Sequence, residues 1–517
     1  MKNEVYRSFN ICALFILLLF VANTAFGIDA TDNISIIKAA GCNLIIDSVS
    51  QDDINLKATS STNWFAGVFK GLATAYQTIL TIDMYDTGGD VSKWEGLYPV
   101  YTYADHFDYN TYIYYIKNDD GYWLSSDPFL KGEAKLAGTG KTPIQSAVPE
   151  IYAEEFLSED GKYWSACGEL KDTRINIGSN TFTITNQFNY PDAFIAMKYP
   201  YTYDYEIVYI EKLKNADISG VTVHEIGKSE QDHELFVIQV SDPNATAEEL
   251  KKRRVVLMYA NEDGNEPDGS WVVNGAMNFL ISGSDEAKKV LKDVTFLFIP
   301  LLDPAGWSDS TYAVMTYDFK YDPHKPVRPE VLSYADFIND WVGEKSNRLD
   351  VVVNLHNIEC NEGPNVLCPM LEGSQIEAID NLNKFLLPQL ETLQEIKTSY
   401  GYWIMGGFSK DRLAGWCSQF WGNIQIAYEI NSRYPEDRLS LYDMNTLGKS
   451  FVISFNEYFD SDEYERAFPQ IEKRRYFQIE LRKKHLPSYL DQEIRFVDHP
   501  NYDVFALRSY RILGRGF

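Results

Sequence analysis

The chain has 517 residues, with 47 Lys and Arg against 74 Asp and Glu, so its formal net charge is −27. A hydrophobic fraction of 45% and a charged fraction of 23% exclude intrinsic disorder for most of the chain, and the length suggests about three domains. The strong negative charge argues against nucleic acid and anionic lipid as partners, because both are negatively charged themselves. The 35 Tyr, 29 Phe and 10 Trp favour a β-rich portion.

The first 27 residues have the layout of a secretory signal peptide. Lys2 and Arg7 precede an apolar run at 11–20, which is too short to span a bilayer comfortably and is followed by small residues. No second apolar stretch is long enough to cross a membrane. We therefore expect cleavage after Gly27 and a secreted, extracellular protein without membrane contact.

Two further features depend on this compartment. The Asn-x-Ser/Thr triplets at Asn33 and Asn244 are candidate glycosylation sites in a secreted protein. Five cysteines remain once Cys12 leaves with the signal, so at least one thiol has no partner within the chain in an oxidising compartment. Cys360 and Cys368 are close enough in sequence to bridge a short loop.

The N-terminal part divides into two stretches. Residues 28–75 form a modest leader without a chemical motif, and residues 76–180 hold a concentration of aromatic residues. Within the second stretch, apolar runs flank the turn at 118–121, which indicates a β-hairpin. We expect an aromatic-rich antiparallel β domain at 76–180, and we favour aromatics that form its core over an aromatic face that binds sugars.

From about residue 190 to 460, apolar strands alternate with helical stretches. This alternation predicts an α/β domain with a mixed, largely parallel sheet flanked by helices. A charged tail, predicted to be helical at its start, occupies 461–517. The expected strands are 255–260, 294–302, 349–355 and 424–430, and the expected helices are 244–253, 271–292, 328–347 and 374–395.

Candidate metal ligands follow two of these strands. The loop after 255–260 carries Asp263 and Glu266 three residues apart, and His356 follows the strand at 349–355. Ligands in such sheets bind beyond the carboxyl ends of the strands. Two carboxylates and one His, with a position left for water, would suit a catalytic zinc ion. Taken alone, these residues fit a solvated acidic loop and a structural His better.

Six segments in order resemble the zinc carboxypeptidase family, of the carboxypeptidase A and cytosolic carboxypeptidase type, and together they cover about half the chain. The entry to the domain is similar to the family's Pro-Tyr-Thr-Tyr helix start, and the next segment resembles its Gly-Lys-Ser hairpin. The others resemble the metal loop, the Asn-Pro-Asp-Gly segment, the third-ligand strand and the catalytic-glutamate strand. The segments are KYPYTYDYEIVYIEKL (198–213), VHEIGKSEQDHELFVIQVSD (223–242), GNEPDGSWVVNG (264–275), IPLLDPAGW (299–307), NLHN (354–357) and AYEINSRY (427–434).

The resemblance implies a zinc site and a general base. Glu266 matches the family's metal glutamate and His356 its second metal histidine. Glu429 matches the catalytic glutamate, which takes a proton from the attacking water and passes it to the leaving amine. The first metal histidine should lie three residues before Glu266, where this chain has Asp263. The implied cofactor is one zinc ion held by Asp263, Glu266 and His356, and loss of the metal is an open alternative.

The residues that should bind the substrate depart further from the family. The arginine that stabilises the oxyanion should fall near Thr311, where no Arg is present. The clamp for the substrate's terminal carboxylate is reduced to Lys320, and Tyr402 is the candidate for the mobile tyrosine. Lys410 lies in the specificity loop and would favour an acidic side chain. The nearest Arg downstream of the clamp, Arg328, reads as a solvated charge at a helix start.

Two functions follow from this pattern. The first is a metallocarboxypeptidase-like hydrolase that cleaves a C-terminal peptide bond or a related amide with an altered site, its partner being a peptide or protein C-terminus. The alternative is a catalytically inactive pseudoenzyme that acts as an extracellular peptide-binding module.

Overall fold

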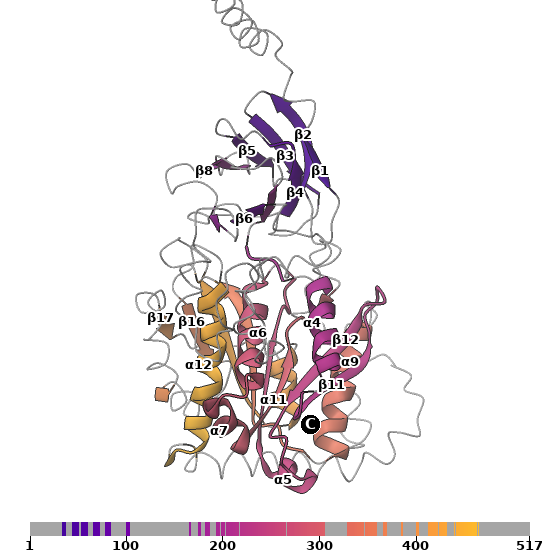
Figure 1. Cartoon of the computed structure of the whole chain (residues 1–517), viewed down its shortest axis with the longest axis vertical. Helices are drawn as coiled ribbons and strands as arrows, with labels where there is room; N and C mark the ends of the chain where they lie inside the picture. The colour runs from indigo at the N-terminus through magenta and orange to yellow at the C-terminus, as the bar shows by residue number, and fades with distance from the viewer. Residues whose placement is uncertain are drawn as a thin grey trace, which may run out of the picture.

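The computed structural model describes two regions, an N-terminal β region and a larger α/β domain (Figure 1). The predicted signal peptide, the hairpin turn at 118–121 and the tail beyond 464 lie outside the described residues, as does the predicted helix at 374–395 except for 384–385. The described residues are 34–37, 44–50, 53–59, 66–72, 78–83, 100–103, 165–166, 174–176, 181–186, 193–196, 198–201, 203–216, 218–264, 266–304, 328–345, 347–358, 365–369, 384–385, 400–402, 412–421, 423–431, 439, 441–462 and 464.

The N-terminal region contains two five-stranded sheets in which every pair is antiparallel except β3 with β5. Each sheet combines strands from the predicted leader with strands from later in the chain. Alternation of buried and half-buried residues along β5 shows that one face of its sheet is packed. In order across the first sheet the strands are β1 (Ser35–Ile37), β4 (Ala66–Lys70), β10 (Ala193–Ala196), β6 (Val100–Tyr103) and β7 (Ser165–Ala166), and across the second β2 (Leu44–Ser50), β3 (Asp53–Ala58), β5 (Thr78–Asp83), β9 (Thr181–Asn186) and β8 (Arg174–Asn176).

The α/β domain is built on one mixed sheet of eight strands, which confirms the predicted fold class. Its centre is a run of four parallel strands in the order β14-β13-β15-β18, and the strands on either side join it antiparallel. All four strands predicted from sequence are these central strands. The eight are β11 (Val221–Lys228), β12 (Glu234–Val240), β14 (Val294–Ile299), β13 (Arg254–Ala260), β15 (Val351–Ile358), β18 (Ile424–Asn431), β16 (Asn365–Pro369) and β17 (Tyr400–Tyr402).

Helices cover both faces of this sheet. Because alternate residues of a strand point to opposite faces, Val256 and Met258 of β13 join one hydrophobic cluster while Val255 and Leu257 join another. No helix among the described residues is long and apolar enough to cross a membrane. The first cluster takes residues from α4 (Tyr203–Ala216), α6 (Asp268–Ile281), α7 (Asp285–Asp293) and α12 (Leu441–Phe459), and the second from α9 (Pro329–Asn339) and α11 (Leu413–Trp421); α5 (Ala247–Lys252) buries no residue.

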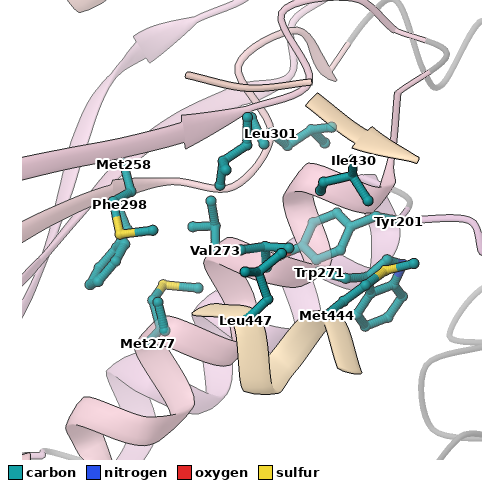
Figure 2. Packing of buried hydrophobic residues seen from close by; sticks show 14 of the residues in the cluster. Tyr201, Met258, Trp271, Val273, Met277, Phe298, Leu301, Ile430, Met444 and Leu447 are labelled. Carbon is teal, nitrogen blue, oxygen red and sulfur yellow. The ribbon is translucent and has the colours of Figure 1, made fainter. Parts of the chain in front are cut away.

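The tightest packing on the first face joins α6 to α12. Figure 2 shows Trp271, Val273 and Met277 of α6 close to Met444 and Leu447 of α12. A Cβ on Gly448 would lie 2.0 Å from the carbonyl oxygen of Val272, so the two helix backbones approach at a point that only glycine allows. This contact fixes α6, and therefore the loop that precedes it, against the sheet.

The helices differ from the sequence predictions in their boundaries. The single helix predicted at 271–292 is two helices, because Gly283 takes a left-handed φ of +71° and Ser284 caps α7. The helix predicted at 328–347 ends as a π-helical turn, η8 (Asp340–Glu344). Helices α11 and α12 were not predicted from the sequence.

Candidate metal centre

The loop between β13 and α6 places two carboxylates at the carboxyl edge of the sheet. Asn261 leaves β13 with a left-handed φ of +58°, and the amide of Glu266 donates to the carbonyl of Asp263 at 3.0 Å, which closes a tight turn. Gly269 then allows α6 to begin against the strands, because a Cβ there would lie 2.7 Å from the carbonyl oxygen of Leu355. The loop is thereby held beside the end of β15.

Asp263, Glu266 and His356 converge at this edge. One ligand atom from each residue lies within 4.8 Å of the others. His356 Nδ1 is 2.7 Å from Glu266 Oε2 and 3.4 Å from Asp263 Oδ2. The His356 side chain is buried, with 2% exposed, whereas the carboxylates keep 12% and 15%. The cluster therefore has a buried side formed by His356 and a more open side formed by the two carboxylates.

The spacing of these atoms can be compared with that of a zinc site. Ligand atoms at about 2.0–2.1 Å around a tetrahedral zinc ion lie about 3.3 Å from one another. The 3.4 Å between His356 and Asp263 agrees with this separation, and the 2.7 Å contact between His356 and Glu266 would have to lengthen. Two carboxylates and an imidazole are chemically suitable zinc ligands, so the residues present fit the ion that the resemblance implies.

A third carboxylate, that of Glu262, is fully buried on the far side of the His356 ring. Glu262 accepts hydrogen bonds from the Asn354 amide at 2.6 Å and from the backbone amide of Leu413 at 3.2 Å. His356 Nε2 lies 3.5 Å from Glu262 Oε2 and 2.7 Å from Arg412 Nη1. The sequence analysis assigned no role to Glu262 or Arg412. The available signals were the position of Glu262 next to Asp263 in the acidic loop and that of Arg412 in the same stretch as Lys410.

The charges around His356 shift its pKa. Burial and the guanidinium of Arg412 both lower the pKa, but Glu266, Asp263 and Glu262 together raise it well above the ordinary value for histidine. An excess of negative charge in a buried site attracts a cation. The excess negative charge of the cluster therefore agrees with ligands that are chemically suited to bind a cation.

Glu429 lies next to His356 in the sheet. Strands β15 and β18 are parallel neighbours, with Glu429 paired to His356 in their register. Burial raises the pKa of Glu429 to about 7; His356 and Arg412 oppose this shift, and the carboxylates of the cluster add to it. A carboxyl group with a pKa near 7 can both accept and donate a proton at neutral pH.

The surroundings of Arg328 show that the prediction of a solvated charge is wrong. Its guanidinium donates to both oxygens of Asp303, at 2.8 and 3.0 Å, and to Glu330 at 3.2 Å. Asp303 is fully buried, so the arginine is drawn inward to neutralise it. Arg328 is thus committed to the protein interior.

The predicted substrate-binding residues fall largely outside the described residues. This is true of Thr311, Lys320 and Lys410, and of the side chain of Tyr402, whose backbone belongs to β17. Their roles stay predictions.

Comparison with known proteins finds similarity to the same family that the sequence motifs suggested. The family model for zinc carboxypeptidases matches residues 207–315. Cytosolic carboxypeptidase 2 of Danio rerio is 25% identical over 187 residues, which are 34% of this chain and 25% of that protein. Cytosolic carboxypeptidase 2 of Homo sapiens is 28% identical over 129 residues, 24% of this chain and 14% of that protein. Over this part of its length the chain is similar to the zinc carboxypeptidase family.

Solved structures of carboxypeptidases share the fold. A metallo-carboxypeptidase from Burkholderia cenocepacia aligns with a TM-score of 0.59 and 14% identity, over 83% of this chain and 99% of that one. A metallo-carboxypeptidase from Pseudomonas aeruginosa gives a TM-score of 0.59 at 13% identity over the same shares. The aligned share exceeds the 190–460 domain, so the common fold includes part of the N-terminal β region. By contrast, the chain matches at most a quarter of the length of the curated relatives described above.

The comparison corrects the predicted location. The prediction of a secreted, extracellular protein is wrong, because the matched relatives of the family are cytosolic carboxypeptidases. The predicted signal peptide and Asn33 lie outside the described residues. Asn244 lies in an exposed turn, where its backbone amide donates to Asp242 Oδ1 at 2.9 Å. Its assignment as a glycosylation site depended on secretion and falls with it.

Proposed function

We propose that this chain is a metallocarboxypeptidase-like hydrolase that cleaves a C-terminal peptide bond, or a related amide bond, with zinc at an altered site. The observation that carries the proposal is the convergence of Asp263, Glu266 and His356 next to Glu429. These residues come from three separate parts of the chain, the β13–α6 loop, β15 and β18. Their meeting at one edge of the sheet supports a site rather than a solvated acidic loop.

The proposal gives the residues two roles in hydrolysis, metal binding and proton transfer. Asp263, Glu266 and His356 would hold the zinc ion, which supplies Lewis-acid chemistry toward a carbonyl oxygen when bound. Glu429 accepts a proton from the attacking water at a carboxylate oxygen and donates it to the leaving amine. Its raised pKa, about 7, suits both directions of transfer. Burial of His356 keeps water from the inner side of the site.

Three departures from the family define the alteration. Asp263 stands where the family has a histidine, which makes the ligand set more anionic. No arginine stands at Thr311, and the loss of an oxyanion stabiliser typically costs about a hundred- to a thousand-fold in rate. Lys320 supplies a point charge rather than a bidentate fork for the terminal carboxylate, with Tyr402 and Lys410 as the other substrate contacts.

The alternative is an inactive peptide-binding module that keeps the fold. Two observations favour it. Asp263 replaces a nitrogen ligand with an oxygen ligand, and Arg328 is committed to Asp303 and Glu330 instead of a substrate. In this alternative the pocket would bind a peptide or protein C-terminus without cleaving it.

Zinc binding and hydrolysis together test the proposal. The purified protein should bind one zinc ion at micromolar metal, and His356→Ala should abolish that binding. A panel of peptides with different C-terminal residues should reveal zinc-dependent release of the terminal residue. Glu429→Gln should lower that rate by about a hundred-fold or more while zinc stays bound.

The outcomes separate the two functions. Zinc binding without any hydrolysis would favour the binding module. If the purified protein binds no zinc, both the proposed zinc cofactor and the proposed hydrolase activity are contradicted.

A further inference from the structure

Helix α6 begins without a side-chain cap from its own N-cap residue. Pro267 stands at that position and makes no side-chain hydrogen bond, and the first amides of a helix have no partner within the helix. The amide of Asp268 donates instead to Asn357 Oδ1 at 3.2 Å. Asn357 belongs to β15, so a strand that lies 89 residues away in the chain supplies the cap of α6.

The side-chain amide of Asn357 makes a second bond to the same residue. Its Nδ2 donates to Asp268 Oδ2 at 2.6 Å and lies 3.5 Å from the carbonyl oxygen of Ile430 in β18. The backbone N–H of Asp268 can only donate, so it requires the oxygen of the Asn357 amide, and this leaves the nitrogen for the carboxylate. Asn357 and Asp268 are both buried, and a buried polar group that loses its partner is costly.

The backbone of Asn357 holds a candidate metal ligand. Its amide donates to Glu266 Oε2 at 3.1 Å, and the same oxygen lies 2.7 Å from His356 Nδ1. Asn357 therefore contacts two points of the loop that enters α6, at Glu266 through its backbone and at Asp268 through its side chain. His356 precedes Asn357 in β15, so the separation between His356 and Glu266 depends on how β15 holds the start of α6.

We propose that Asn357 is a positioning residue for the metal centre. By capping α6, its side chain holds Glu266 at the distance from His356 that a shared cation needs. This inference rests on the zinc site of the proposed function and deepens it, because it assigns the geometry of the ligands to a residue that does not bind the metal itself.

The zinc affinity of the full-length protein tests this role. Asn357→Leu keeps a side chain of similar size and removes both of its hydrogen bonds to Asp268. We expect zinc binding to weaken about ten- to a hundred-fold in a competition with a chromophoric chelator, which is the usual effect of losing a residue that orients metal ligands. Circular dichroism should show that the variant is folded at the temperature of the measurement.

Asn278→Leu is the matched control for a general loss of stability. Asn278 is also a buried asparagine on an α6 contact, where it accepts from the Tyr209 hydroxyl at 2.6 Å and donates to Asn274 at 2.9 Å. It lies ten residues beyond Asp268, about 15 Å along the helix. Asn278→Leu should unfold at a lower temperature than the wild type and keep the zinc affinity of the wild type.

Exchange of the two side chains tests the geometry without a change of net charge. Asn357→Asp alone places two carboxyl groups side by side and should weaken zinc binding, although added negative charge by itself attracts a cation. Addition of Asp268→Asn restores an acceptor for the Asp268 backbone amide and a donor between the side chains. The double variant should therefore recover most of the wild-type affinity.

The results separate this inference from the function on which it rests. Wild-type zinc affinity in a folded Asn357→Leu would overturn the inference, and so would an equal weakening in Asn278→Leu. If Asn357→Leu does not fold, the exchange decides, and a double variant that fails to fold or to regain affinity overturns the inference. Absence of zinc binding in the wild type would overturn the metal site itself, and the inference with it.

Discussion

At the scale of single residues, the proposed ligand Asp263 should decide which cation the candidate site prefers. Zinc favours nitrogen and sulfur ligands, whereas oxygen-rich sets suit manganese and magnesium better. Asp263→His should therefore raise the preference for zinc over manganese by about tenfold, since it restores a second nitrogen ligand. Competitive metal binding by the purified variant measures this ratio.

Asp263→Asn is the control for that substitution. It removes the same negative charge but supplies no nitrogen ligand, because an amide binds cations through its oxygen. It should weaken the binding of both metals and leave their ratio unchanged. A similar gain of zinc preference in Asp263→Asn would mean that charge, and not ligand type, decides selectivity.

The residues of the site were predictable to different degrees. Asp263, Glu266 and His356 could be placed together because their segments resemble the family's metal loop and third-ligand strand; their positions near strand ends alone favoured a solvated acidic loop and a structural His. Arg412 could not, because it lies 56 residues from His356 and precedes a helix that the sequence did not reveal. Arg328 was misread because nothing in its neighbourhood shows that Asp303 is buried and needs a cation.

His224 makes stability depend on pH away from the metal centre. Burial lowers the pKa of His224, although a hydrogen bond with Gln239 opposes the shift. The unfolded chain therefore binds a proton at a higher pH than the folded one, and the folded state loses stability as pH falls through about 6.5. Relative to His224→Gln, the wild type should become less stable between about pH 7.5 and 5.

Denaturant unfolding of both proteins at the two pH values measures this effect. The difference in unfolding free energy between wild type and His224→Gln should move against the wild type in acid. A constant difference, or a wild type that gains stability in acid, would contradict the assignment.

At the scale of elements, the central strands were predictable and several helices were not. The strands at 255–260 and 424–430 are buried on both faces, which leaves an unbroken apolar run in the sequence. Helix α11 is buried and has apolar residues on most of its surface, so it shows no clear helical period. The break at Gly283 depends on a backbone angle that composition alone does not fix.

The contact between α6 and α12 makes a sharp prediction. Gly448→Ala would place a methyl group 2.0 Å from the carbonyl oxygen of Val272 and 2.6 Å from the amide of Ala276, so the helices must separate. Overpacking of this kind costs about 1–3 kcal/mol of unfolding free energy. Thermal unfolding of the variant should show the loss.

Glu457→Ala is the control on the same helix. Glu457 is exposed on α12, so its replacement should change the free energy by less than about 0.5 kcal/mol. An unaltered stability in Gly448→Ala would show that the helices can separate at no cost.

At the scale of the whole molecule, the N-terminal β region and the α/β domain share a core. One hydrophobic cluster runs from Leu44 and Phe69 in the sheets to Tyr201 and to Trp271 of α6, and the Trp271 indole donates to the carbonyl of Tyr199 at 3.1 Å. The sequence suggested separate segments because composition changes along the chain. It contains no local sign that the segments are packed together.

The shared core predicts that the two regions unfold as one unit. Phe69 is fully buried in β4, and Phe69→Ala should cost about 3–5 kcal/mol through lost contacts and a cavity. If the regions are coupled, this loss should accelerate hydrogen exchange in β13 and β15 as much as in β3 and β5, which mass spectrometry of peptide fragments can measure. Ile45→Ala, at a side chain that is 48% exposed, should leave exchange in all four strands unchanged. Faster exchange confined to β3 and β5 in Phe69→Ala would show instead that the α/β domain, with its candidate metal ligands, is stable without the β region.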